Sequence, residues 1–386
     1  MTTAIETGRK SDIPPPAATV GIVGWLRENL FATWPSTVLT LVSLWIIYLA
    51  IPPVIQWALI DAHWVGNDAS ACKTSTGERL PGACWVYIES WIGGFIYGLY
   101  PYDLRWRVDL AAVVTVALFL PLAVKRLPFK NVYGVAVILL YPLIAYFLFR
   151  GFIDIPPGGP GADTQPWRVV PTDKWGGLAL TLLIASVGII ASLPLGILLA
   201  LGRRSKMPII STFSVLFIEL WRGVPLITVL FMSSVMLPLF LPEGMNFDKL
   251  LRALIGVTLF SAAYMAEVVR AGLQAIPKGQ NEAAQALGLS YAKSMALIVL
   301  PQALRYVIPS IVNTFIGLFK DTTLVAIIGM FDLLGAIQLG NADPKWLGFG
   351  IEGYAFAALV YFCFCFSMSR YSQFLERKLH TGHKKR

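Results

Sequence analysis

The sequence predicts an all-α integral membrane protein with about eight transmembrane helices. Of its 386 residues, 56% are hydrophobic and 14% are charged, whereas a soluble globular chain carries about 25% charged residues. Apolar runs long enough to cross a bilayer recur along the chain, and clusters of lysine and arginine separate them. Most of the protein surface is therefore expected to face lipid rather than water.

Each predicted span is a run of about 20 apolar residues, the length that crosses the hydrocarbon core of a bilayer. The seventh run exceeds one crossing and contains Pro301 and Pro309, so we expect an approach segment followed by a kinked span. The eight runs are residues 37–60, 109–124, 131–149, 176–201, 224–241, 250–269, 297–330 and 353–375.

The basic residues predict the orientation, because cytoplasmic loops carry an excess of lysine and arginine. With the N-terminus inside, most basic clusters fall in the cytoplasm, and an even number of spans brings the C-terminus inside as well. The net charge of +9 is therefore assigned to loop bias and not to nucleic-acid binding. We expect a multi-pass membrane protein, surrounded by lipid, with both termini cytoplasmic. The clusters are Arg9/Lys10/Arg27, Lys125/Arg126/Lys130, Arg203/Arg204/Lys206, Arg270/Lys278/Lys293 and the tail from Arg370 to Arg386.

The sequence lacks the common catalytic motifs. It contains no G-x-x-x-x-G-K-[ST] phosphate-binding loop, no H-E-x-x-H motif, no Ser/His/Asp constellation and no convincing metal-ligand spacing. We therefore expect no enzymatic activity and no cofactor or metal in this chain. Energy for uphill transport would come from an ion gradient or from another subunit.

Residues 279–288 (Gly-Gln-Asn-Glu-Ala-Ala-Gln-Ala-Leu-Gly) lie in a loop that we expect in the cytoplasm. They predict a short helix that carries Glu282 in its first turn, where an acid interacts favourably with the helix dipole. The small Ala283 and Ala284 permit close approach by another surface, and Gly288 lets the chain turn. This pattern indicates a docking element, and an ordinary alanine-rich connecting helix is the alternative.

The spacing E-A-A, three residues, G, nine residues and I-x-L-P resembles the loop signature of permease subunits in binding-protein-dependent ABC importers. In that family the segment is the coupling helix, which fits into a cleft of the ATPase subunit. The resemblance implies these ATPase-coupling residues: Glu282, Ala283, Ala284, Gly288, Ile298, Leu300 and Pro301.

Neighbouring segments resemble the polar amino-acid branch of this family. Residues 219–226 are similar to E-x-x-R-G-T-P-L, with Val224 in place of the usual threonine. Residues 262–272 are similar to A-A-Y-x-A-E-x-x-R-G, with Ala271 where glycine is usual. Residues 320–324 are similar to K-D-T-S-L. These conservative departures bear on substrate detail rather than on the family.

The resemblance implies a type I ABC importer permease core of five helices. The three helices that precede it look like those of the larger, M-type permease subunit of general L-amino-acid importers. We therefore expect a cytoplasmic segment over residues 1–36, a three-helix membrane extension with periplasmic loops over 37–175, the permease core with its coupling loop over 176–376 and a basic cytoplasmic tail over 377–386.

The family also implies a location in the bacterial inner membrane, and it implies the partners. They are a second homologous permease chain, two ATPase subunits that bind ATP and Mg at the cytoplasmic face, and a periplasmic amino-acid-binding protein. ATP-driven closure of the ATPases would move the coupling helix and switch the pathway between its two open sides. An ion-coupled secondary amino-acid transporter is the alternative, but it predicts inverted repeats with matching broken helices, which the sequence does not show.

Polar residues inside the seventh run mark a candidate substrate pathway. A charge at the centre of a bilayer costs about 2.5–3.5 kcal/mol on insertion scales, so it usually has a function or a partner. Lys320 would suit a carboxylate and Asp321 an ammonium group. The hydroxyls of Thr322 and Thr323 follow them, and Asn313 lies seven residues before Lys320 on a similar helix face. A polar cluster that fixes helix packing is the alternative.

Two pairs of opposite charges lie near the predicted cytoplasmic ends of helices. Glu219 and Arg222 are three residues apart and can pair on one helix face, and Glu267 and Arg270 repeat the spacing. This position favours helix packing or closure of a gate over contact with substrate.

The four cysteines form two groups. Cys72 and Cys84 lie in a polar, tryptophan-rich loop, and a disulfide between them is chemically permitted if the loop is extracytoplasmic. Two free thiols are the alternative, because sequence does not show that the sulfur atoms meet. Cys363 and Cys365 lie within the last apolar run, which indicates helix packing rather than redox chemistry.

Overall fold

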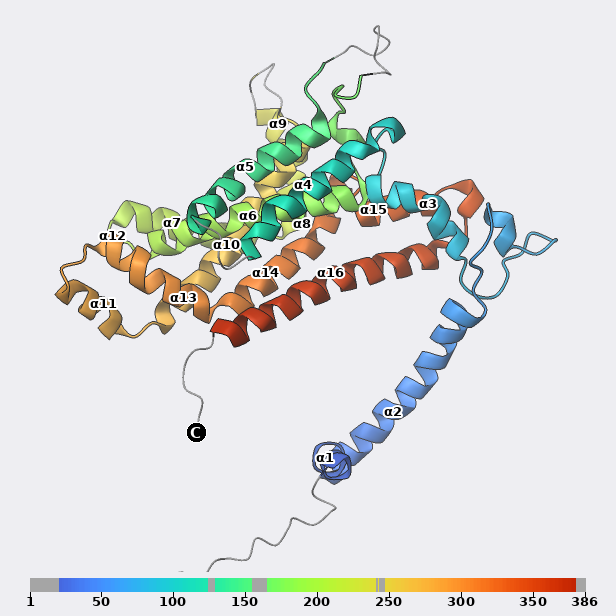
Figure 1. Cartoon of the computed structure of the whole chain (residues 1–386), viewed down its shortest axis with the longest axis horizontal. Coiled ribbons are helices and arrows are strands. Elements are labelled where there is room, and N and C mark those ends of the chain that lie inside the picture. Colours follow the sequence, from blue (N-terminus) through green and yellow to red (C-terminus); the bar gives the residue numbers. More distant parts are fainter. Residues whose placement is uncertain (1–20, 124–128, 155–164, 241, 243–246, 380–386) are drawn as a thin grey trace, which may run out of the picture. The chain divides into compact units, whose positions relative to one another are not determined.

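The chain is built from α-helices throughout residues 21–123, 129–154, 165–240, 242 and 247–379, which the computed structural model describes (Figure 1). Most of the expected N-terminal segment 1–36 and basic tail 377–386 lies outside these residues. The helices are α1 (Gly21–Asn29), α2 (Trp34–Ile55), α3 (Trp85–Tyr97), α4 (Arg105–Ala123), α5 (Lys130–Arg150), α6 (Gly177–Arg203), α7 (Pro208–Gly223), α8 (Leu226–Phe231), α9 (Leu237–Phe240), α10 (Lys249–Ala275), α11 (Lys278–Ala286), α12 (Tyr291–Ser294), α13 (Leu300–Tyr306), α14 (Ile308–Asp321), α15 (Leu333–Asn341) and α16 (Gly350–Leu379).

The chain divides into two compact units, residues 21–66 with 70–86 and residues 67–69 with 87–379. In the first unit, Thr33 and Ser36 cap α2 reciprocally: the Thr33 side chain accepts from the Ser36 N–H, and the Ser36 side chain accepts from the Thr33 N–H. The helix continues through a π-helix, so the expected run 37–60 forms one helical span over Trp34–Ile60. None of its residues is buried, which leaves its surface available to lipid or other chains.

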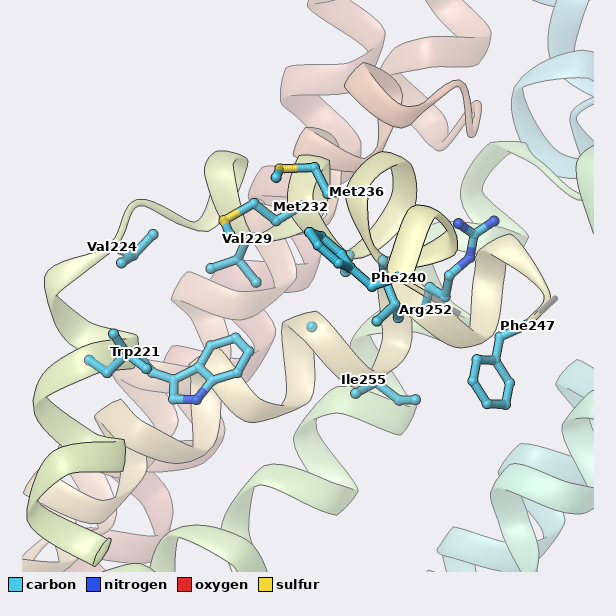
Figure 2. Close-up of a pocket in the computed structure, with 13 residues that line it drawn as sticks. Trp221, Val224, Val229, Met232, Met236, Phe240, Phe247, Arg252 and Ile255 are labelled. Carbon is cyan, nitrogen blue, oxygen red and sulfur yellow. The ribbon is translucent and has the colours of Figure 1, made fainter. Parts of the chain in front are cut away.

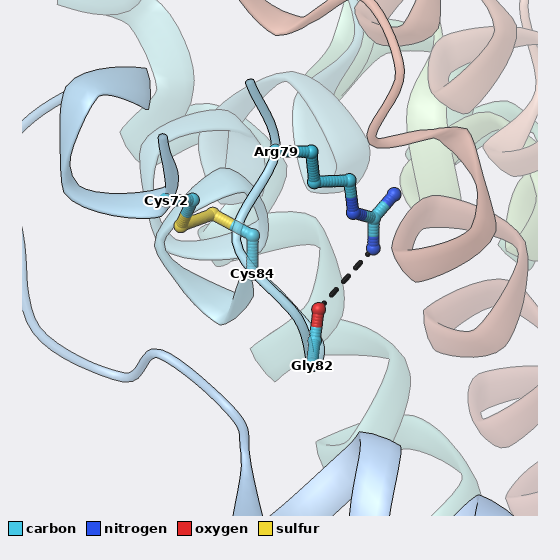
Figure 3. Close-up of a disulfide and its surroundings, with 4 residues drawn as sticks. All are labelled: Cys72, Arg79, Gly82 and Cys84. Carbon is cyan, nitrogen blue, oxygen red and sulfur yellow. Dashed lines mark hydrogen bonds between the residues drawn. A yellow bond between two sulfur atoms is a disulfide. The ribbon is translucent and has the colours of Figure 1, made fainter. Parts of the chain in front are cut away.

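A disulfide closes the loop that follows α2 (Figure 3). It joins Cys72 to Cys84, whose Cα atoms are 5.9 Å apart, and the Arg79 guanidinium donates a hydrogen bond to the carbonyl of Gly82 nearby. The indole of Trp85 donates to the carbonyl of Ala58 at 2.9 Å. The structure therefore contains the disulfide that the sequence permits. The hydrogen bond from Trp85 also ties the loop to the end of the first span.

In the second unit, small residues let the two central helices, α6 and α10, approach closely. A Cβ atom placed on Gly196 of α6 would lie only 2.7 Å from the Cβ of Met265 on α10. A Cβ atom placed on Gly188 would likewise lie 3.2 Å from the nearest side-chain atom of Leu318 on α14. In the most apolar 18-residue stretch of each helix, 61% is buried in α10 and 33% in α6. The helix α10 therefore forms the centre of the bundle.

The described residues contain six helices that are long and apolar enough to span a membrane, or seven if a bent pair counts as one span. The expected number was about eight. The helix α4 is not among them, because Arg105, Arg107 and Asp109 occupy its first turns. The bent pair consists of α7 and the segment Leu226–Phe240, which meet at 102°. The sequence predicted a span only over residues 224–241, which correspond to the segment Leu226–Phe240, and did not predict α7.

The long seventh run divides as its two prolines predict. A chain of short segments, α12, the π-helix Met295–Val299 and α13, forms the approach. Pro309 then stands in the first turn of α14, which continues as a 3₁₀-helix over Thr322–Ile328 to complete one span over Ile308–Ile328. This confirms the division into an approach segment and a span.

Two short helices that the sequence analysis did not predict, α3 and α15, lie together at the end of the second unit opposite α11 (Figure 1). The hydroxyl of Tyr87 on α3 donates to Oδ1 of Asn341 at the end of α15, at 2.8 Å. Gly340 makes room for this contact, because a Cβ there would lie 2.5 Å from the Tyr87 hydroxyl. Both helices are too short to cross a bilayer.

Candidate functional site

The candidate docking helix is α11, which begins at Lys278 and ends at Ala286, so Glu282 lies in its second turn and not in the predicted first turn. It projects from one end of the second unit, near the C-terminal end of α16 (Figure 1). Glu282 and Ala283 are exposed, and Leu287 directly after the helix is 77% exposed. An exposed large apolar side chain beside exposed small ones suits a surface that another protein covers.

Ala284 differs from its neighbours, because it is only 1% exposed and points into the chain itself. Gly288 ends the helix with φ +73°, a conformation that glycine adopts without strain. Two backbone bonds close this turn, from the N–H of Gly288 to Gln285 and from that of Leu289 to Ala284. Ala284 therefore packs within this chain, and its small side chain lets the chain fold back on the helix.

The return arm carries the last three residues of the motif. Ile298 lies in the π-helix Met295–Val299, and Leu300 and Pro301 open α13. Ile298 and Leu300 are partly buried, whereas Pro301 is exposed. The amide of Gln302 donates to Oε1 of Gln280 at 3.1 Å, which links the two arms.

A cluster of charged side chains joins the ends of α6, α7 and α10, close to where the chain enters α11. The central residue is Glu267, which is 16% exposed. Its Oε1 accepts from Arg203 at 2.5 Å, and its Oε2 lies 2.6 Å from Arg270. Arg203 also contacts Glu219 at 3.1 Å. Three helices therefore share one ionic network.

This network corrects one predicted pair. In the described part of the chain, Glu219 pairs with Arg203 of another helix and not with Arg222 on its own helix. The guanidinium of Arg222 instead lies over the ring of Tyr264, 5.6 Å from its centroid, and 3.8 Å from Glu267. Sequence spacing found the contact between Glu267 and Arg270 but missed Arg203, because 64 residues separate Arg203 from Glu267.

Asn313 and Lys320, two of the pathway candidates, lie exposed along α14. Ser310, which is exposed, and Gly317, which is partly exposed, complete a stripe of polar residues and glycine, because the four positions follow the i, i+3, i+7, i+10 spacing of one helix face. A Cβ on Gly317 would meet no atom within 4 Å. The stripe is therefore unobstructed within the described chain.

The structure separates the threonines from this stripe. Thr322 is fully buried and donates to the carbonyl of Phe319, so it faces the interior of the bundle and does not line an open pathway. Thr323 donates to the carbonyl of Lys320, and Asp321 is partly buried. The change from α-helix to 3₁₀-helix at Thr322 alters the face that each later residue presents.

Asp332 is a buried polar residue that the sequence analysis missed. Its carboxylate caps α15 by accepting from the N–H of Gly335 at 3.0 Å, and it also accepts from the hydroxyl of Tyr361 at 3.1 Å. Thr181 of α6 accepts a hydrogen bond from the N–H of Leu333, the first residue of α15. Burial raises the pKa of the Asp332 carboxyl above its usual value. An aspartate directly before an apolar helical pattern is the signal that could have found this cap.

A cavity of about 460 Å³ lies between α7, the α8–α9 segment and α10 (Figure 2). Apolar side chains such as Trp221, Met232 and Phe240 line it. Arg252 also borders it, but its guanidinium lies on the side away from Trp221 and donates to the carbonyl of Ser234 in the π-helix Met232–Met236. Such an apolar lining does not suit a free zwitterion. Elsewhere in the described residues, no group of three or more His, Cys, Asp and Glu side chains could hold a metal ion.

Comparison with known proteins identifies the family. Residues 192–381 match the model of the binding-protein-dependent transport system inner membrane component. The inner membrane amino-acid ABC transporter permease protein YhdY of Escherichia coli (strain K12) is 54% identical, and the alignment covers 93% of both chains. The chain belongs to this family.

One further relative agrees with the assignment, and a solved structure is also similar in sequence. The permease is 41% identical to the glutamate/glutamine/aspartate/asparagine transport system permease protein BztC of Rhodobacter capsulatus, over 99% of both chains. A solved amino acid ABC transporter described with histidines is 30% identical and covers 52% of this chain and 92% of its own, with a TM-score of 0.47.

Membership of the family decides between the two predicted kinds of transporter. The chain is a non-catalytic transport subunit of an ABC importer, and a separate ATPase hydrolyses ATP. It is a multi-pass protein of the inner membrane, as its apolar helices predict. The family assignment made from the coupling-loop signature is confirmed, and an ion-coupled secondary transporter is not supported.

Proposed function

We propose that this permease forms part of the translocation pathway for L-amino acids and couples it to ATPase subunits through α11. Both relatives that align along almost the whole chain are named as permeases of amino-acid transport systems. A periplasmic amino-acid-binding protein would deliver the cargo, and two ATPase subunits with ATP and Mg would act at the cytoplasmic face.

The observation that carries the coupling role is the exposure of α11. The helix buries only Ala284 in this chain and presents Glu282, Ala283 and Leu287 outward. The bond between Gln302 and Gln280 fixes it to the return arm. Because α11 follows directly after α10, a force applied to this helix would pass into the charged cluster around Glu267 and the centre of the bundle.

The polar stripe on α14 supports the pathway role. Exposed polar groups on a membrane helix are costly against lipid, by about 2.5–3.5 kcal/mol for a lysine at the bilayer centre. Asn313, Gly317 and Lys320 are therefore expected to face an aqueous path or another protein. A second permease chain opposite this face would close the path, and Lys320 would meet the carboxylate of the cargo.

The charged cluster suits a cytoplasmic closure rather than a substrate site. Glu267 already makes contacts with Arg203 and Arg270 and lies 3.8 Å from Arg222. Its carboxylate is thus occupied by cations from three helices. Separating α6, α7 and α10 during transport would require these contacts to break, so the cluster would hold the closed state together.

The disulfide supports the predicted orientation. Such bonds persist in oxidising compartments and are rare in the cytosol, so the loop that holds Cys72 and Cys84 is expected in the periplasm. With α2 spanning the membrane, residues 1–36 would then lie in the cytoplasm. The tail 377–386 would return to the same side if α4 and the bent pair of α7 and Leu226–Phe240 each make one crossing, eight in all. Residues 37–175 would form the extension, and 176–376 the core.

The test is ATP-driven uptake by the permease reconstituted with its candidate partners in vesicles. Radiolabelled amino acid should accumulate only with ATP and a binding protein. Glu282→Lys should abolish most uptake without affecting membrane insertion, because it reverses the charge on the proposed docking face. Glu376→Lys is the control, since it reverses an exposed charge on α16. Normal uptake by the Glu282→Lys complex would exclude α11 as the coupling element.

A further inference from the structure

An apolar groove of about 600 Å³ runs between α5, α6 and α10. All three helices contain candidate membrane spans. Leu143 of α5, Val187 and Ala191 of α6 and Leu254 of α10 contribute to its walls. A groove of this composition between membrane helices excludes water and suits hydrocarbon.

One charged residue lines this groove, and another of opposite sign contacts one of its lining residues. Asp248, which precedes α10, lines the groove and is exposed. Tyr146 of α5 also lines it, and the guanidinium of Arg150 lies 5.9 Å from the centroid of the Tyr146 ring. Arg150 is the last residue of its membrane span, the depth at which lipid headgroups begin.

Neither charge has an ionic partner among the described residues. Arg150 makes its cation–π contact with Tyr146 and no ion pair there. The Asp248 carboxylate accepts from the N–H groups of Leu250 and Leu251 and from the hydroxyl of Thr172, at 2.6 Å for the hydroxyl. These are neutral donors, so the carboxylate keeps a net charge that a cation could neutralise.

We propose that the groove binds a phosphatidylethanolamine-type glycerophospholipid. An acyl chain fills the apolar walls, the phosphate meets Arg150, and the ammonium group meets Asp248. Charge-assisted hydrogen bonds of both signs recognise this zwitterionic headgroup, whereas an anionic phosphatidylglycerol would satisfy only the arginine. The bound lipid would fill the space between α5 of the predicted extension and the two central helices of the core.

Native mass spectrometry of the delipidated full-length permease, titrated separately with phosphatidylethanolamine and phosphatidylglycerol, tests the site. The wild-type chain should retain phosphatidylethanolamine preferentially. Arg150→Gln should weaken binding of both lipids about tenfold, because it removes a charged hydrogen-bond donor. Asp248→Asn should remove the preference alone, since asparagine still caps α10 well.

A groove-filling variant separates this site from general lipid binding. Ala191→Trp should remove the retained lipid, whereas Leu198→Trp, on an exposed part of the same helix, should not. Equal retention by the Ala191→Trp and wild-type chains would refute the site. A wild-type chain without headgroup preference would also refute it. An Ala191→Trp chain that keeps its lipid but fails to assemble with a second permease chain would refute it as well, because the groove would then be a protein interface.

Discussion

At the scale of single residues, Glu267 has the most contacts in the charged cluster. It is 16% exposed and has an arginine on each carboxylate oxygen, whereas Glu219 is 55% exposed and forms an ion pair only with Arg203 in the described part of the chain. A carboxylate that is largely removed from water interacts strongly with its partners, while an exposed one is screened. The two glutamates therefore contribute unequally to holding α6, α7 and α10.

Glu267→Gln should lower the free energy of unfolding by about 2 kcal/mol, because it leaves the neighbouring arginines without their shared anion. Glu219→Gln should lower it by less than about 1 kcal/mol, as for an exposed ion pair. Thermal unfolding of both variants in the same detergent measures the difference. Equal losses would contradict a central role for Glu267.

At the scale of elements, α14 has two different faces. Ile311 and Leu318 are buried in the bundle, whereas Asn313 and Lys320 are exposed and Gly317 is partly exposed. Gly317 offers no side chain to either face and has open space beside its Cα atom. Because glycine has no side chain, this face of α14 stays open at the middle of the span.

Gly317→Trp should abolish most ATP-driven uptake and leave the permease folded, because a Cβ there meets no atom of this chain within 4 Å and the new side chain would extend into the proposed pathway. Leu359→Trp, at an exposed position of α16, is the bulk-matched control and should transport normally. Uptake in proteoliposomes and melting temperature measure the two effects. A Gly317→Trp chain that transports at the wild-type rate would place the pathway elsewhere.

At the scale of the whole molecule, the two units are held together internally by different means. The first contains a span with no buried residue and a loop closed by the Cys72–Cys84 disulfide. In the second, the fully buried Arg107 of α4 donates to the carbonyls of Leu148, Phe149 and Arg168, each at 2.9 Å. This fixes α4 against the end of α5 and the chain that leads into α6.

The Cys72→Ser/Cys84→Ser double variant should destabilise the loop by about 2–3 kcal/mol, because a 12-residue separation closes a short loop in the unfolded chain. Amide hydrogen exchange should rise in residues 61–85 and stay unchanged in α6 and α10. The single variant Cys363→Ser is the control, since that thiol is free. Faster exchange spread over α10 would show that the two units are not independent.

Sequence alone determined the class, most of the spans and the family. Hydrophobic length is set by bilayer thickness, so long apolar runs identify spans without knowledge of their neighbours. The coupling-loop signature lies within 20 residues and is therefore visible in the chain. The helix over Lys278–Ala286 and the turn at Gly288 also follow from local sequence, because a short helix and a left-handed glycine depend on nearby residues.

Tertiary structure decided which distant residues meet and which way each side chain points. Arg203 reaches Glu267 only because α6 and α10 pack closely at glycines, and Thr322 turns inward because the helix tightens there. The helices α3 and α15 are too short to give a membrane signal, so only their packing defines them. Local patterns encode lengths and turns, but contacts across tens or hundreds of residues arise from the three-dimensional packing of the whole chain.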